Sequence, residues 1–387
     1  MTFAQHSPRR FQHGFSLVEI MMALLIGMFG VIVMMQVFSI SETQKRNATG
    51  AGDAQGEGSI ALYGLQRDLR MAGYGITQYN LLGCNITMPS GAVIPLAPVV
   101  INPAAIPAGD PNTDRLLVLY GSASGAPEGN QITTNDKPNY TVSSLGIVSV
   151  NDYVFTGPSP AATCAGNLAL DRVIDVKVAN VVTVANGAAG DTLYSLGQTL
   201  KVMAYAVRNG NLTVCDYVAN NCGDAAQTND TTRWVPIANN VVSLRAQYGR
   251  DDKNNKNPLW TQVAIDAVIN ATPNAPHPPP NYIVGTYDQA TPSGANVQCG
   301  WARIPAVRLA LTVRNAQYEK EVVTAAEPTW EGNATLPIDV SKQPIDVNVS
   351  KQPDGLANPD WQNYRYKVFQ TTVPLRNVAW MGVQAGC

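Results

Sequence analysis

The chain has 387 residues, enough for one large domain or two smaller ones. Hydrophobic residues make up 45% of it and charged residues only 14%, so we expect a packed core under a surface that is mostly polar but uncharged. The formal net charge of −2 argues against a nucleic-acid-binding protein, which usually presents a basic face.

The first predicted element is a long hydrophobic helix near the N-terminus. From Phe15 to Phe38 the only charged residue is Glu19, and a helix of this length, roughly 36 Å at 1.5 Å per residue, is long enough to cross a bilayer. Arg9 and Arg10 precede the segment, so the positive-inside rule places the N-terminal tail in the cytoplasm and the rest of the chain outside. A secretory signal peptide cut near Ser41 is the alternative, but the length of the segment and its early carboxylate argue against it.

Glu19 is the unusual residue of this segment, because a charge within a membrane helix is costly and marks a candidate functional residue. The sequence from Gly14 to Glu19, Gly-Phe-Ser-Leu-Val-Glu, resembles the processing motif of type IV prepilins and pseudopilins. The resemblance implies that a prepilin peptidase cuts after Gly14, that the new N-terminal Phe15 is methylated, and that Glu19 is kept for assembly as the fifth mature residue. The alternative to an assembly role is that the Glu19 side chain only extends to the lipid headgroups and has no specific function.

A second helical stretch follows the hydrophobic segment. Four apolar residues recur at helical spacing and form one stripe: Leu62, Leu65, Leu69 and Ala72. The charged residues between them are expected to face away from this stripe: Arg67, Asp68 and Arg70. Gly73 and Gly75 are expected to end the helix. Because glycine weakens helices, a flexible or broken helix is expected at Gly50, Gly52, Gly56 and Gly58.

Beyond Gly75 the sequence indicates strands and turns. Alternation and short apolar runs predict strands at Asp114–Tyr120, Val202–Val207, Leu212–Tyr217, Asn240–Tyr248, Pro305–Arg314 and Tyr364–Leu375. Asn209-Gly210 is a strong signal for a two-residue hairpin turn. The segment Thr87–Asn112 is expected to be a long loop.

Four segments resemble the PilW family of minor pilins. They are Gln66–Tyr74, Asn240–Gly249, Ile304–Arg308 and Val368–Asn377. With the N-terminal motif, this resemblance implies an α+β fold with three parts: a prepilin leader (1–14), a transmembrane and assembly helix (15–75), and a large antiparallel β-rich head (76–387). The J-type minor pseudopilin of type II secretion is a rival family, but its members are usually much shorter.

The six cysteines all follow the membrane segment, as expected of an exported head in an oxidising compartment. Cys215 and Cys222 are close enough in sequence to close a short loop, and we favour this disulfide. The pairing of the other four stays open: Cys84, Cys164, Cys299 and Cys387.

The sequence argues against an enzyme and against a metal site. Of the three histidines, His6 and His13 leave with the predicted leader and His277 lies in a proline-rich stretch, so histidine-based triads are nearly excluded. The cysteine spacing does not suit zinc. Asp251 and Asp252 could offer oxygens to calcium, but interleaved lysines favour a solvated turn. No catalytic residue, metal or cofactor is therefore predicted, although paired-carboxylate chemistry stays open.

These observations predict a non-enzymatic structural protein, a minor pilin that takes part in initiating type IV pilus assembly and is incorporated at or near the pilus tip. The implied partners are the prepilin peptidase, other minor pilins, the major pilin and the inner membrane, with no nucleic acid. The chain is expected to cross the inner membrane once, with its head in the periplasm, before it reaches the pilus on the cell surface. A J-type pseudopilin and a pilin-anchored adhesin or binding module are the alternatives.

Overall fold

A computed structural model describes residues 14, 16–76, 78–122, 128–146, 148–159, 166–251, 282–294, 297–341, 360–379 and 381. The chain divides into two compact units, Met1–Gly52 and Asp53–Cys387. Several residues singled out above lie outside the described ones: residues 1–13, Phe15, Cys164, Asp252, His277 and Cys387.

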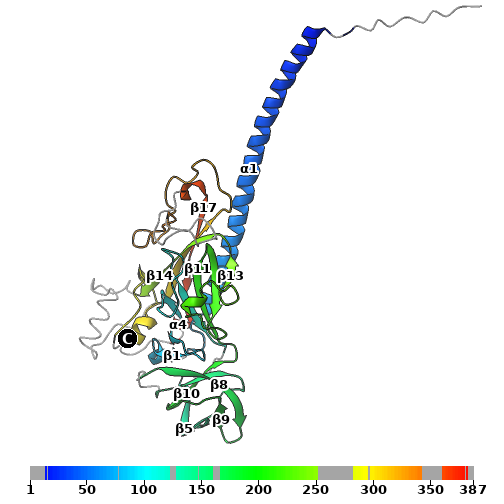
Figure 1. Ribbon diagram of the computed structural model, residues 1–387. Helices are drawn as coiled ribbons and strands as arrows, with labels where there is room; N and C mark the ends of the chain where they lie inside the picture. The colour runs from blue at the N-terminus through cyan, green and yellow to red at the C-terminus, as the bar shows by residue number, and fades with distance from the viewer. Residues whose placement is uncertain are drawn as a thin grey trace, which may run out of the picture. The chain divides into compact units, whose positions relative to one another are not determined.

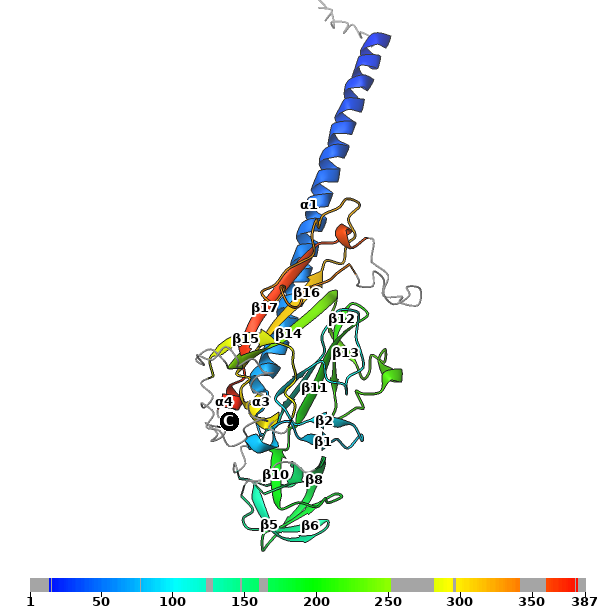
Figure 2. The same cartoon turned by 90° about the vertical axis from the view of Figure 1, so that its left-hand side faces the viewer.

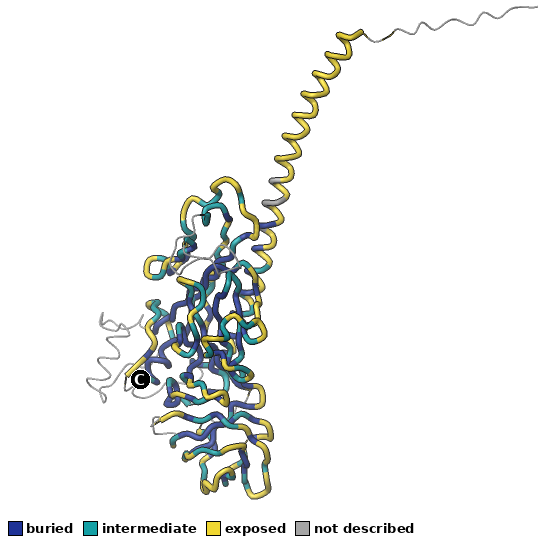
Figure 3. The backbone as a smooth tube through the Cα atoms, in the orientation of Figure 1, coloured by how far each residue is buried: buried dark blue, intermediate teal, exposed yellow. Residues whose placement is uncertain are grey.

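Helix α1 (Leu17–Met71) starts in the first unit and ends in the second (Figure 1). In the first unit, Leu17–Glu42 is long and apolar enough to cross a membrane, and its side chains are exposed (Figure 3). Glu19 lies in the first turn of the helix, where a negative charge is stabilised by the helix dipole. No proline lies within Leu17–Met71, so none of its helical hydrogen bonds is lost to a missing backbone N–H, and the helix is uninterrupted.

The predicted break at the glycines is wrong, because residues 50–58 are helical throughout. Each glycine in a helix costs up to about 1 kcal/mol relative to alanine. In the second unit, packing accounts for at least one of them: a Cβ on Gly58 would lie 2.2 Å from the ring of Phe369. The absence of a side chain at Gly58 therefore permits the close contact between α1 and the strand that carries Phe369.

The C-terminal end of α1 is where the sequence predicts it. Gly73 and Gly75 follow the last helical residue with φ of +80° and +87°, a conformation that glycine adopts without strain. The side-chain amide of Asn377 donates to the carbonyl oxygens of Met71 and Ala72 at 3.1 and 3.0 Å. These bonds satisfy acceptors that a helix end leaves without partners.

The second unit contains two purely antiparallel sheets that form the main core with α1 (Figures 1 and 2). One has the strand order β15 (Val284–Asp288), β14 (Val241–Asp251), β16 (Ala306–Arg314) and β17 (Tyr366–Pro374). The other has the order β13 (Val235–Ala238), β12 (Asn211–Asp216), β11 (Lys201–Arg208), β4 (Leu116–Tyr120) and β3 (Val99–Ile101). The short helices are η1 (Tyr79–Leu81), η2 (Ala225–Gln227), α3 (Val297–Ala302), η4 (Trp361–Asn363) and α4 (Arg376–Ala379).

All six predicted strands are present, with ends that differ by a few residues. The hairpin between β11 and β12 is also confirmed: Asn209 and Gly210 have φ of +52° and +69°, as a two-residue turn of this kind requires. The predicted loop Thr87–Asn112 is wrong in part, because it contains β2 (Val93–Pro95) and β3. Both strands are only three residues long, so their sequences carry little periodicity.

A third sheet closes into a barrel that no sequence signal predicted. Its strands pair in the order β8-β7-β10-β5-β6-β9, and β9 pairs again with β8. The bounds are β5 (Asn130–Asp136), β6 (Asn139–Val142), β7 (Tyr153–Gly157), β8 (Leu168–Lys177), β9 (Val181–Val184) and β10 (Thr192–Gly197). Strand β1 (Asn85–Thr87) joins β8 in a short parallel pairing and links the barrel to β2.

Three members of the predicted apolar stripe of α1 pack into the main core, because Leu65, Leu69 and Ala72 are fully buried. The fourth, Leu62, is only half-buried, and the neighbouring Ala61 is buried in its place. Asp68, however, was expected to face away from the stripe, and this was wrong. Asp68 is only 4% exposed, and its carboxylate accepts hydrogen bonds from the hydroxyl groups of Tyr205 and, at 3.2 Å, Tyr120. Burial and the neighbouring charge of Asp68 raise the pKa of Tyr205, and that of Tyr120 to about 12.

The contact of Asp68 with the two tyrosines predicts a large stability effect. We expect Asp68→Ala to lower the free energy of unfolding by about 3 kcal/mol, because it removes hydrogen bonds to a charged group and leaves the buried Tyr205 hydroxyl without its acceptor. The measurement is the denaturant midpoint of the full chain in detergent. Arg67→Ala is the matched control. The Arg67 side chain is 69% exposed and pairs with the Asp68 carboxylate at 3.3 Å, and an ion pair whose cation faces solvent contributes about 1 kcal/mol or less. Equal effects of the two substitutions would contradict the prediction.

Candidate functional site

The candidate functional site is the start of α1 with the residues just before it. Gly14 is exposed and lies outside the helix, and a Cβ added to it would meet no atom within 4 Å. The first helical hydrogen bond runs from the backbone N–H of Ile20 to the carbonyl of Ser16, at 3.1 Å. The peptide bond after Gly14 therefore precedes the hydrogen-bonded helix, and a peptidase needs such an accessible, non-helical bond.

Glu19 shares one helix face with two small residues. Glu19, Ala23 and Gly27 follow each other at intervals of four residues along the exposed helix, next to the larger apolar side chains of Ile20, Leu24, Met28 and Val31. Small residues on such a face allow the backbone of another helix to approach closely. Glu19 is the only charged residue between positions 16 and 41, so a helix packed on this face would meet a single carboxylate in apolar surroundings.

The structure contains the disulfide that the sequence favoured. Cys215 on β12 is bonded to Cys222, and both residues are buried. Between them, the hydroxyl of Tyr217 donates to the backbone carbonyl of Ala105, which attaches the loop to the segment before β4. Cys84 and Cys299 are also in disulfides. Such bonds are typical of proteins from oxidising compartments.

Removing the Cys215–Cys222 disulfide is expected to destabilise the second unit. The bond joins residues seven apart in sequence, and closing so short a loop stabilises a fold by about 2.5 kcal/mol in the chain-entropy account. We expect Cys215→Ser with Cys222→Ser to lower the free energy of unfolding by roughly this amount. The measurement compares the double variant with the native chain in denaturant. Peptide mapping without reduction is the control, and free thiols at both positions of the native chain would contradict the pairing.

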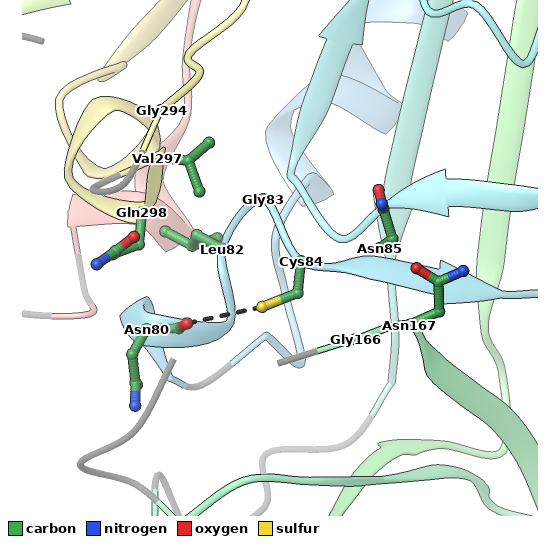
Figure 4. Close-up of a pocket in the computed structure, with 10 residues that line it drawn as sticks. All are labelled: Asn80, Leu82, Gly83, Cys84, Asn85, Gly166, Asn167, Gly294, Val297 and Gln298. Carbon is green, nitrogen blue, oxygen red and sulfur yellow. Dashed lines mark hydrogen bonds between the residues drawn. The ribbon is translucent and has the colours of Figure 1, made fainter. Parts of the chain in front are cut away.

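A cavity of about 390 Å³ lies beside Cys84, between η1, α3 and the start of β8 (Figure 4). Its side-chain polar groups are amides, from Asn80, Asn85, Asn167 and Gln298. The sulfur of Cys84 lies 3.7 Å from the carbonyl oxygen of Asn80, but it is in a disulfide and has no proton to donate. None of the ten lining residues is acidic or basic, so they provide neither an acid–base pair nor a free thiol.

The residues considered for a metal do not form a site in the described part of the chain. No group of three His, Cys, Asp or Glu side chains is close enough there to hold a metal ion. Asp251 is buried at the end of β14 and accepts a hydrogen bond from the backbone N–H of Tyr282 at 2.8 Å. Its carboxylate thus has a structural partner, and Asp252 lies outside the described residues.

Comparison with known proteins gives two matches. Residues 204–377 match the family model of type IV pilus-assembly protein W, and residues 9–35 match the prokaryotic N-terminal methylation motif. The first match contains three of the segments whose resemblance was noted from sequence, Asn240–Gly249, Ile304–Arg308 and Val368–Asn377. No curated protein and no solved structure matches the chain. The methylation motif together with the apolar part of α1 indicates membrane anchoring.

Proposed function

This chain is a PilW-like type IV prepilin-like protein of pilus assembly, and from this premise we propose that it is a minor pilin that helps to initiate the pilus and is incorporated at or near its tip. The observation that supports the proposal best is the order of the segments along the chain. A methylation motif leads into an exposed apolar helix in which Glu19 is the only charged residue before Glu42, and a β-rich body with the PilW match follows.

The helix supplies the means of assembly in this proposal. Inside a bundle of apolar helices an unpaired carboxylate is unfavourable by several kcal/mol, whereas a carboxylate paired with an amine is tolerated. The methylated amine of Phe15, from the same chain or from a neighbour, would supply that partner for Glu19. The face with Ala23 and Gly27 allows the neighbouring helix to come close. Pairing of the two charges would then favour one axial register between subunits.

The proposed partners and location follow from the same parts. The prepilin peptidase cuts the chain after Gly14, other minor pilins and the major pilin pack against the helix, and the chain crosses the inner membrane once. The body lies in the periplasm before incorporation into the pilus, which agrees with its disulfides. We propose no catalytic activity.

A deletion strain tests the proposal. Cells without this protein should yield few or no pili on shearing, and the native chain should restore them. Measuring secreted proteins in the same cells distinguishes a minor pilin from a J-type pseudopilin. A pseudopilin would be required for type II secretion and dispensable for pili. A pilin-anchored adhesin would leave piliation normal and reduce only attachment. Normal piliation without any copy of the chain would refute the assembly role.

A further inference from the structure

The six-stranded barrel, residues 128–197, is inserted at one point of the five-stranded sheet. Strand β4 ends at Tyr120 and β11 begins at Lys201, and these two residues are direct partners in the antiparallel pairing. The chain therefore leaves the sheet and returns to it at the same place. Without the intervening residues, β4 and β11 would need only a hairpin turn to connect them.

The barrel has an apolar core of its own. Eight buried residues form it, separate from the main core: Tyr140, Val142, Val148, Val154, Val173, Val182, Val184 and Leu193. A few residues at one end of the barrel, among them Leu168 and Leu196, pack into the main core instead. The barrel is thus attached through one end, and its interior is filled by its own side chains.

The strands of the barrel pair mainly with one another. Every strand from β5 to β10 pairs on both sides, because β8 and β9 complete the ring. The ring is joined least between β5 and β10, where only two residue pairs are formed.

The part of α1 in the second unit is bonded to elements other than the barrel. From Asp53 onward, the side chains of α1 bond to the remaining parts of the second unit: Asp68 to Tyr120 and Tyr205, Gln66 to Thr371 at 2.7 Å, and Glu57 to the backbone of Asn239. Among the described residues, no hydrogen bond joins this part of α1 to residues 128–197. The match to the pilus-assembly family also begins after the barrel, at residue 204.

We propose that the barrel is an inserted module whose role is separate from assembly, while α1 and the other two sheets carry the assembly function. This rests on the minor-pilin role proposed above. The body of the protein is then divided into a scaffold that enters the fibre and a self-contained barrel attached to it. Assembly should tolerate loss of the barrel fold but not loss of the main core.

Three substitutions of the same kind, each apolar to aspartate, test this division in the full-length chain. Val182→Asp places a carboxylate in the barrel core, Leu309→Asp places one in the main core, and Val178→Asp places one on the surface of the barrel, where the native side chain is 95% exposed. Each variant is expressed in cells that lack the native protein. Sheared pili are quantified, and limited proteolysis of the membrane fraction maps which segments are cut.

Val182→Asp should raise cleavage within residues 128–197 by about tenfold or more, because a buried unpaired carboxylate disfavours the folded barrel. The rest of the chain should stay resistant, and piliation should stay within about twofold of native, as for Val178→Asp, since stability effects of distant, independent sites do not couple. Leu309→Asp should abolish piliation. Loss of pili with Val182→Asp, at native chain level, would overturn the proposal.

A second variant replaces residues 121–200 by Asn-Gly, so that β4 and β11 form a hairpin. It should accumulate, be processed and support piliation. Failure to accumulate, or accumulation without pili, would overturn the separation of roles whatever the point substitution shows. Comparing native cells with cells that lack the whole protein keeps the assembly proposal distinct from the barrel proposal. Normal pili without any copy refute the assembly role, whereas loss of pili in the barrel variants alone refutes only the independence of the barrel.

Discussion

Replacing Gly14 by valine is expected to block removal of the leader and with it all pilus assembly by this chain. The peptidase must hold the backbone on both sides of the bond it cuts, and a branched side chain next to that bond displaces it from the catalytic groups. Displacement by about 1 Å slows an enzyme by roughly 100-fold or more. Gly14 has open space around it, so the substitution should act on recognition by the peptidase without disturbing the fold.

Mass spectrometry of the N-terminus is the measurement. The native chain should begin at a methylated Phe15, and Gly14→Val should retain residues 1–14. Gly30→Val is the matched control, because Gly30 also has open space around it but lies far from the cut. It should be processed normally. A native N-terminus near Ser41 would instead identify an ordinary secretory signal peptide.

Glu19→Ala is expected to reduce piliation by about tenfold or more, because assembly loses the only charge that can pair with the mature N-terminal amine within the apolar bundle. Cleavage after Gly14 and folding of the second unit should be unaffected, since Glu19 is exposed and belongs to the first unit. Glu19→Asp keeps the charge on a shorter side chain and should be milder. Glu19→Gln keeps the size without the charge and should resemble Glu19→Ala.

Processing is followed by gel mobility and piliation by shearing, in cells that lack the native protein and express each variant at native level. The comparison of glutamine with aspartate separates charge from size. Equal piliation by all three variants and the native chain would show that the Glu19 carboxylate only reaches the headgroup boundary. Loss of cleavage in Glu19→Ala would show instead that the residue acts in recognition by the peptidase.

The processing and assembly residues can be predicted from sequence because their signal is local. Gly14, Phe15 and Glu19 stand at short, defined spacings next to a long apolar segment, and no distant part of the chain is needed to recognise them. The same holds for the turn at Asn209-Gly210 and for the Cys215–Cys222 pair, whose partners are neighbours in sequence. The missed features, the burial of Asp68 and the cap from Asn377, depend on residues that are far apart in sequence.

The sequence by itself determined the apolar helix, the end of α1 and the principal strands, because periodicity and turn residues act within a few positions of each other. Only the tertiary structure showed that α1 continues through its glycines, and it gives a packing reason for one of them, since Phe369 occupies the space that a side chain at Gly58 would need. It also decided that Asp68 is buried, because the hydroxyl groups of Tyr120 on β4 and Tyr205 on β11 donate hydrogen bonds to its carboxylate. The existence of the barrel was also evident only from the tertiary structure. Strand β5 has mostly exposed polar residues, and its strand pairing comes from a closed ring of contacts that no local pattern records.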